Sequence, residues 1–212
     1  MMSGSRAGSA GSARLDFAVD RAKAYTIMLS GVGASWQEKL PYVLLNSEFH
    51  CVAAYRFGQY AQALRSRHAL AGTVAVIGYR LVNRWITHLD HAVISQDARI
   101  GAGMLLMHGH GILIGEAVIG KNCVIFQNIT IGQRSAAGDH GLPRIGDNVW
   151  IGPGAVISGA ITIGDGVTIS AGTVLCRDVP SGCLVAGNPG RVVARDYDNS
   201  RMLNFLAPPT EA

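Results

Sequence analysis

Three histidines in the C-terminal half of the chain have side chains that can move protons near neutral pH. His108 and His110 alternate with Gly109 and Gly111, and His140 follows later, in the segment Gly-Asp-His-Gly-Leu-Pro. An imidazole with an unperturbed pKa of about 6.5 can take a proton from an alcohol, which is otherwise a poor nucleophile. Three imidazoles could also ligate zinc. A turn histidine with a satisfied hydrogen bond, or a solvated loop histidine, is the alternative, so the surrounding elements must decide.

The composition limits the classes of protein that could carry these histidines. Of the 212 residues, 27 are Gly and 7 are Pro, and 15% are charged, which excludes a collagen and a disordered polyampholyte. The net charge of +4 comes without basic runs interleaved with aromatics, so no nucleic-acid partner is expected, whereas a phosphate-bearing ligand fits. The four cysteines form no CxxC pair and predict reduced thiols in a cytoplasmic protein.

The N-terminal part of the chain is predicted to be helical after a short tail. Residues 1–14 contain no apolar segment typical of a secretory signal and are predicted to be a flexible tail. Apolar residues recur at three- and four-residue steps over 52–64, and a second candidate helix covers 70–86, so 15–90 is taken as a helical region. The apolar run 69–79 is too short for a bilayer span of roughly 20 residues, so it predicts a core or subunit-packing helix, and no membrane contact is expected.

A six-residue repeat follows the helical region. It runs without a slip through Ile145, Ile151, Ile157, Ile163, Ile169 and Leu175, and the same spacing joins Ile119, Ile125 and Ile131. Each of the first five positions precedes Gly or Ser, and 19 of the 27 glycines lie within 100–190. Short strands separated by turns with small residues predict a β-helix whose aliphatic side chains point inward. The longer step from Ile131 to Ile145 predicts an excursion loop within 132–144.

The hexads, the helical region and the segment 108–116, His-Gly-His-Gly-Ile-Leu-Ile-Gly-Glu, resemble the hexapeptide-repeat acyltransferases, above all their serine acetyltransferase-like branch. The resemblance implies a left-handed parallel β-helix over 91–193, between the helical region 15–90 and a C-terminal tail 194–212. It also implies a homotrimer, or a dimer of trimers, that binds acetyl-CoA in the groove between neighbouring β-helices. No metal is expected on this reading.

The resemblance also implies roles for individual residues. His108 would be the general base that deprotonates an acceptor hydroxyl, and a displaced loop could bring His140 to the same site. The residues of the acceptor site would be Met107, His110, Glu116, Arg134 and Asp139. The residues that contact CoA or leave room for it would be Gly152, Pro153, Ala171, Gly187, Pro189 and Arg191.

Two positions depart from the serine acetyltransferases and bear on the acceptor. Val93 stands where those enzymes carry an Asp that orients the base, and Met107 stands where they carry an Asp next to it. Without these carboxylates, the ammonium of free serine would lack its partner. The sequence therefore favours a hydroxyl of a saccharide or polysaccharide precursor, with serine as the alternative. A trimeric β-helix zinc lyase and a catalytically idle assembly scaffold are the remaining hypotheses.

Overall fold

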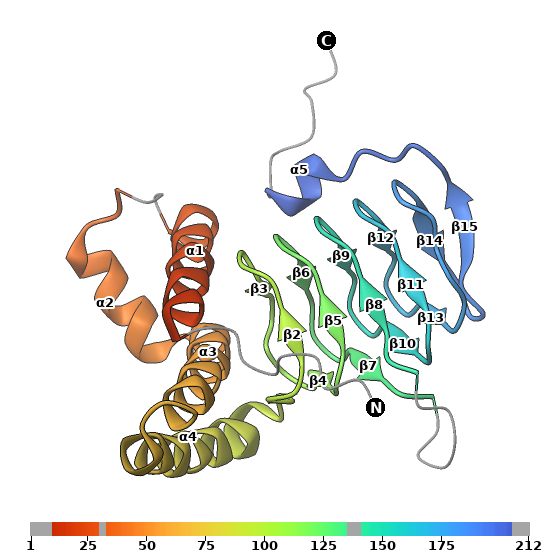
Figure 1. The fold of residues 1–212 in the computed structure, drawn as a ribbon. Helices are drawn as coiled ribbons and strands as arrows, with labels where there is room; N and C mark the ends of the chain where they lie inside the picture. The colour runs from red at the N-terminus through yellow and green to blue at the C-terminus, as the bar shows by residue number, and fades with distance from the viewer. Residues whose placement is uncertain (1–9, 30–32, 135–140, 205–212) are drawn as a thin grey trace.

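The protein consists of a helical region followed by a β-helix (Figure 1). The computed structural model describes residues 10–29, 33–134 and 141–204. The helices of the first region are α1 (Ala10–Met28), α2 (Trp36–Leu45), α3 (Ser47–Arg65) and α4 (Ala69–Asp90). They cover the end of the β-helix at which its first strands lie. The windows predicted to be helical, 52–64 and 70–86, lie within α3 and α4.

Helix α1 begins earlier than predicted. It starts at Ala10, within the segment that the sequence assigns to a flexible tail through residue 14. Ala13 is buried, and Arg14 donates a hydrogen bond to Tyr60 Oη on α3 at 3.1 Å. The tail prediction was wrong for residues 10–14, because these contacts with α3 stabilise a helical turn that has no signal of its own in the sequence.

The chain then winds through short strands that form three sheets. The five-stranded sheet contains β1 (Val93–Ile94), β4 (Leu113–Ile114), β7 (Thr130–Gly132), β10 (Val156–Ser158) and β13 (Val174–Leu175). The four-stranded sheet contains β2 (Arg99–Ile100), β5 (Val118–Ile119), β8 (Arg144–Ile145) and β11 (Thr162–Ile163). The six-stranded sheet contains β3 (Leu105–Leu106), β6 (Val124–Ile125), β9 (Trp150–Ile151), β12 (Thr168–Ile169), β14 (Leu184–Ala186) and β15 (Arg191–Ala194). These strands pair in parallel, except for the antiparallel pair β14–β15.

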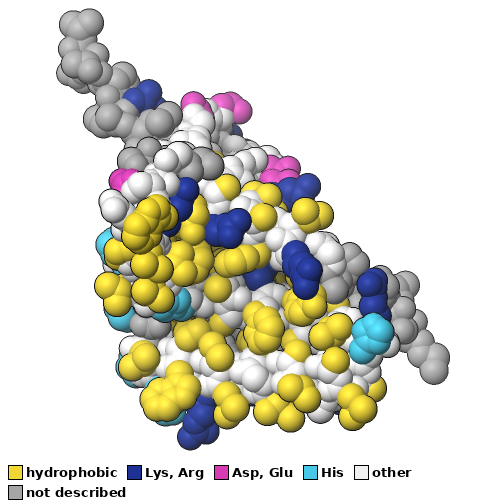
Figure 2. All heavy atoms as spheres, turned by 90° about the vertical axis from the view of Figure 1, so that its left-hand side faces the viewer, with side chains coloured by type: hydrophobic (Ala, Val, Ile, Leu, Met, Phe, Trp, Pro, Cys, Tyr) yellow, Lys and Arg dark blue, Asp and Glu magenta, His cyan; other side chains and the backbone are white. Residues whose placement is uncertain are grey.

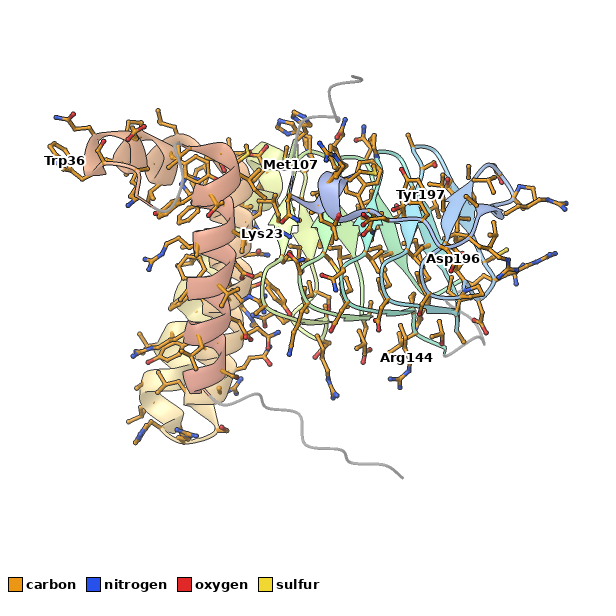
Figure 3. All side chains as sticks on the ribbon, turned by 90° about the horizontal axis from the view of Figure 1, so that it is seen from above. Lys23, Trp36, Met107, Arg144, Asp196 and Tyr197 are labelled. Atoms are coloured by element: carbon orange, nitrogen blue, oxygen red, sulfur yellow. The ribbon has the colours of Figure 1, made fainter. Side chains whose placement is uncertain are left out.

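The aliphatic residues of the hexads form the core, as predicted. Their exposed fractions are 3% for Ile145, 0% for Ile151, Ile157 and Ile169, 1% for Ile163 and 2% for Leu175. The residue before each of them points outward, and Arg144, for example, projects from the four-stranded sheet into solvent (Figure 3). The period of six therefore corresponds to one side of a three-sided coil, which confirms the predicted parallel β-helix.

The strand register locates the positions at which the coils depart from this period. Ile114 comes eight positions after Leu106, whereas their partners on the next coil, Ile131 and Ile125, are six positions apart. The turn that carries His108 is thus two residues longer than the turn beside it. The predicted excursion lies between β7 and β8, and its residues 135–140 are outside the described part of the chain.

A buried ion pair joins the helical region to the first coil. Arg56 Nε on α3 donates to Asp20 Oδ2 on α1 at 2.7 Å, and the two side chains are 4% and 1% exposed. Arg56 also donates to the carbonyl oxygens of Ile100 and Gly101, and Asp20 Oδ1 accepts from the backbone N–H of Met104 at 2.9 Å. Two helices and the turn after β2 therefore share one hydrogen-bonded cluster.

The predicted C-terminal tail also contains ordered structure. β15 extends to Ala194, and α5 (Ser200–Leu203) places Leu203, which is 3% exposed, in an apolar cluster with Leu105 and Val124. Asn199 Nδ2 donates to the carbonyl oxygen of Asn148 at 2.9 Å. The prediction of a tail was wrong for this segment, because the outer face of the six-stranded sheet is apolar here and the chain folds back to cover it.

The helical region keeps an apolar outer surface. Leu70 and Trp85 on α4 and Trp36 on α2 are 87%, 69% and 70% exposed. Figure 2 shows hydrophobic side chains across this face with Lys and Arg between them. The core-helix alternative for the run 69–79 was wrong, because one side of the run packs on α3 and the other is open, and the subunit-packing alternative stays a prediction. Over the described ranges, no helix is both long and apolar enough to cross a membrane.

Candidate active site

His108 lies on the lengthened turn between β3 and β4, with its side chain exposed. Its φ is 54°, a left-handed conformation that costs a non-glycine residue about 1–2 kcal/mol. The turn is held by hydrogen bonds on both sides. His110 N donates to His108 O at 2.6 Å, and Asn128 N on the next coil donates to His110 O at 2.9 Å. Backbone strain held in place by its surroundings is often found at functional sites, and here it presents an imidazole to solvent.

Aromatic side chains of the following coils stand beside this imidazole. The rings of His108 and Phe126 have centroids 6.2 Å apart, and those of Phe126 and Trp150 are 4.9 Å apart. Phe126 and Trp150 are half-buried and pack with Met107 on the outer face of the six-stranded sheet. One side of the base is therefore apolar.

The two positions at which the sequence lacks a carboxylate are apolar in their surroundings as well. Val93 on β1 is paired with Leu113 and is 37% exposed. Met107 packs against the apolar cluster that contains Leu105 and Val124. Neither position brings an acid to His108.

A carboxylate that the sequence reasoning missed reaches the same turn from the helical region. Glu48, in the first turn of α3, accepts a hydrogen bond through Oε1 from the backbone N–H of Gly109 at 3.0 Å. A Cβ at position 109 would lie 3.2 Å from Glu48 Cγ, so the absence of a side chain on Gly109 lets α3 approach. Asn46, the N-cap of α3, fixes this helix end by accepting from Phe49 N at 2.7 Å. No spacing in the sequence connects residue 48 with residue 109.

The predicted CoA residues follow His108 along one edge of the β-helix. We call this the histidine edge, defined by the turns that leave the six-stranded sheet at 107–112, 126–129, 152–155, 170–173 and 187–190. Consecutive turns are bonded, since Gly154 N donates to Gln127 O at 2.9 Å and Gly172 N donates to Pro153 O at 2.8 Å. The edge brings His108 and His110 into one row with Gly152, Pro153, Ala171, Gly187 and Pro189.

The structure leaves little space inside these turns and open surface outside them. A Cβ on Gly152 would lie 2.8 Å from both Ala171 N and Ile169 O, so a larger residue would separate the coils. Ala171 is exposed on the outer side. Arg191 is exposed in β15, where it pairs with Ala186. Their roles in binding CoA remain predictions.

Other predicted acceptor residues lie at a different edge. Glu116 follows β4 and Arg134 follows β7, so both are in turns that lead from the five-stranded to the four-stranded sheet, and both are exposed. Within one chain, the five-stranded sheet separates them from His108. Asp139 and His140 lie outside the described residues. The structure therefore brings His108 and His110 together but does not place Glu116 or Arg134 beside them.

In the described part of the chain, no three side chains of His, Cys, Asp or Glu are grouped so that they could hold a metal ion. The zinc hypothesis drawn from the sequence required three ligands, His108, His110 and His140. Of these, His140 is not among the described residues.

Similarity to known proteins extends over both the sequence and the fold. Residues 143–177 match the family described as bacterial transferase hexapeptide (six repeats). Serine acetyltransferase 1, chloroplastic, from Arabidopsis thaliana is 36% identical over 117 residues, which make up 55% of this chain and 37% of that protein. The chain thus spans less than two fifths of the length of this curated relative.

Solved structures match a larger share. The crystal structure of serine acetyltransferase from Vibrio cholerae O1 biovar El Tor N16961 has a TM-score of 0.71 at 30% identity and covers 92% of this chain and 70% of its own. A structure of serine acetyltransferase in complex with Coenzyme A, from Brucella abortus strain S19, has a TM-score of 0.64 at 26% identity, with 87% of this chain and 67% of that chain covered.

Proposed function

We propose that this chain, which belongs to the serine acetyltransferase family of hexapeptide-repeat transferases, moves the acetyl group of acetyl-CoA to the hydroxyl of free serine. The observation that carries the proposal is the strained, lengthened turn that exposes His108 at the start of the histidine edge. The relatives favour serine over the saccharide acceptor that the sequence alone suggested.

In the proposed reaction, His108 is the general base. Its imidazole takes the proton of the serine hydroxyl as that oxygen attacks the thioester carbonyl carbon, and the carbon–sulfur bond then breaks. The same imidazolium returns the proton to the departing sulfur, so atoms and charge balance and no acyl-enzyme is needed. Acetyl-CoA supplies the activated acyl group. The apolar wall of Phe126 and Trp150 would exclude water from one side of the base.

The histidine edge suits acetyl-CoA, a thioester whose extended pantetheine arm carries amide groups. Its turns expose small residues such as Ala171, which leave space for a pantetheine arm. Gln127 Oε1, in the second turn of this edge, is buried with no partner among the described residues, and an amide N–H of the arm could satisfy it. Arg191, which is exposed at the far end of the edge, would contact a phosphate of CoA.

We further propose a homotrimer with left-handed coils, as in this family. The outer face of the five-stranded sheet carries an aliphatic row that includes Val93, Leu113, Val156 and Val174. Val93 and Leu113 are 37% and 47% exposed, and a neighbouring copy would cover them. Packing across this sheet would also bring Arg134 of one copy towards His108 of the next.

The four cysteines support the predicted cytoplasmic location. None of the four is in a disulfide, and Cys51, Cys123 and Cys183 are buried. Free, buried thiols are typical of proteins from a reducing compartment. The location itself remains a proposal.

A saccharide hydroxyl is the second candidate acceptor, because Val93 and Met107 lack the carboxylates expected for serine. The test is release of CoA thiol by the full chain with acetyl-CoA and either L-serine, L-threonine or neutral mono- and disaccharides. We expect serine to be the best acceptor. Faster turnover with a saccharide would make the saccharide the proposed acceptor in place of serine. Stoichiometric zinc in the active protein would overturn the acetyltransferase proposal.

A further inference from the structure

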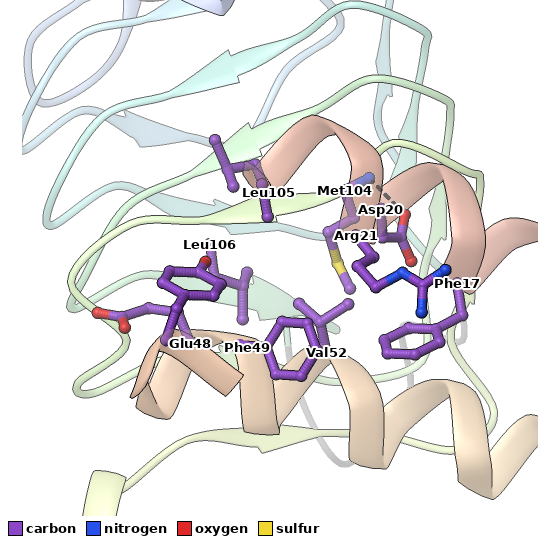
Figure 4. Close-up of a pocket in the computed structure, with 11 residues that line it drawn as sticks. Phe17, Asp20, Arg21, Glu48, Phe49, Val52, Met104, Leu105 and Leu106 are labelled. Carbon is purple, nitrogen blue, oxygen red and sulfur yellow. Dashed lines mark hydrogen bonds between the residues drawn. The ribbon is translucent and has the colours of Figure 1, made fainter. Parts of the chain in front are cut away.

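Glu48 is an acid in an unusual place, at the junction of the helical region and the turn that carries His108. It is half-buried, and one carboxylate oxygen is held by the N–H of Gly109 at 3.0 Å. Figure 4 shows its side chain leaving the apolar cluster of Phe49 and Leu106, with the carboxylate directed away from them. The group is thus held in place and aimed out of the core.

Glu48 has no cationic partner within the described ranges. The ion pairs there join Arg56 to Asp16 and Asp20, and none of them includes Glu48. The negative charge of Glu48 also reaches Tyr42, whose pKa is raised to about 12, mainly by burial and then by this charge. The groups that stabilise this negative charge are the N–H of Gly109 and the N-terminal turn of α3, and a cationic ligand would add a full positive charge to them.

From this arrangement we infer that Glu48 binds the α-ammonium group of the acceptor amino acid and selects for it. The inference rests on the proposed function, since free serine carries an ammonium beside its hydroxyl and a neutral saccharide does not. Glu48 supplies from α3 the negative charge that is absent at Met107, one residue before the base, and at Val93. A neutral saccharide could donate a hydroxyl hydrogen bond to this carboxylate but would lack the attraction between opposite charges.

The position of the hydrogen bond supports this role. Gly109 directly follows His108, so this hydrogen bond holds the Glu48 carboxylate beside the residue that carries the imidazole. Serine needs its two binding groups close together, because its hydroxyl and ammonium are attached to neighbouring carbons. Oε1 of Glu48 is occupied by Gly109, and Oε2 has no hydrogen-bond partner among the described residues, which leaves it for the ligand.

The test compares two acceptors that differ only in the ammonium. L-serine and 3-hydroxypropanoate carry the same hydroxyl and carboxylate, and the second lacks the α-amino group. For Glu48→Gln we expect kcat/KM for serine to fall by about 10- to 100-fold, as for a lost charge-assisted contact, while the value for 3-hydroxypropanoate changes less than about threefold. Asp97→Asn, which removes an exposed carboxylate elsewhere on the first coil, is the matched control. Calorimetric binding of the two acceptors provides a second readout that does not depend on turnover.

Three outcomes would overturn the inference. An unchanged kcat/KM for serine in Glu48→Gln would mean that the ammonium binds elsewhere. An equal loss for both acceptors would mean that Glu48 only shapes the turn at Gly109. If the parent chain acetylates saccharides and neither binds nor acetylates serine, the proposed function itself fails, and this result is visible before any variant is made.

Discussion

Lys23 Nζ donates a hydrogen bond to Asn122 Oδ1 at 2.5 Å and another to Asn122 O at 3.2 Å, which ties α1 to the second coil of the β-helix. Figure 3 places Lys23 on the side of α1 that faces the β-helix. Burial lowers the pKa of Lys23 to about 8, and the charges of Cys123 and Asp20 only partly oppose this shift. The contact that docks α1 therefore contains a poorly solvated ammonium.

This ammonium predicts a stability that rises with pH. Between about pH 8 and the unfolded pKa of 10.5, the unfolded chain binds more protons at Lys23 than the folded chain, so the free energy of unfolding increases with pH. Lys23→Met removes the titrating group. We expect the free energy of unfolding of this variant at pH 7, measured by urea denaturation, to exceed that of the parent by about 2 kcal/mol. The advantage should vanish by pH 10.5. A variant whose relative stability does not change over this range would show that burial of Lys23 has no energetic effect.

The buried pair of Arg56 and Asp20 predicts a large loss of stability when one partner is removed. Arg56→Met leaves the Asp20 carboxylate buried without its cation, and such changes cost about 3–5 kcal/mol. Arg14→Met is the control, since Arg14 contacts Tyr60 at an exposed site and should lose less than about 1 kcal/mol. Urea unfolding of the two variants measures both. Similar losses for the two would mean that the junction does not depend on the buried pair.

His108 predicts a loss of turnover without a loss of fold. His108→Asn suits the test, because Asn tolerates the left-handed conformation seen at φ 54° but cannot act as the base. We expect kcat to fall by at least about 100-fold, with the thermal midpoint close to that of the parent. His88→Asn on α4 should keep full activity. Retention of most of the activity by His108→Asn would remove His108 as the base.

The aliphatic row on the five-stranded sheet predicts a site-specific effect on assembly. Leu113→Arg places a charge in the proposed interface and should dissociate the trimer. The sedimentation coefficient should then fall from the value of a trimer to that of a monomer. Thr162→Arg makes a similar change on the outer face of the four-stranded sheet, where Thr162 is exposed, and should leave the trimer intact. A trimer that survives Leu113→Arg and dissociates with Thr162→Arg would place the interface on the other sheet.

The sequence by itself determined the architecture of the C-terminal half. The step of six from Ile145 to Leu175 is a local pattern, and one side of each coil contains both the inward aliphatic residue and the small residue of its turn. The importance of the segment around His108 was also evident from its resemblance to a family. The two extra residues of its turn became clear only from the strand register.

The tertiary structure decided which residues meet. Glu48 and Gly109 are 61 positions apart, and their contact depends on how α3 packs against the first coil, which no periodicity encodes. Glu116 lies close to His108 in sequence, but the five-stranded sheet separates them because a coil turns through a corner between the two. Local spacing determines secondary structure and core, whereas a site assembled from distant segments depends on long-range packing, and so its acid was found only in the folded chain.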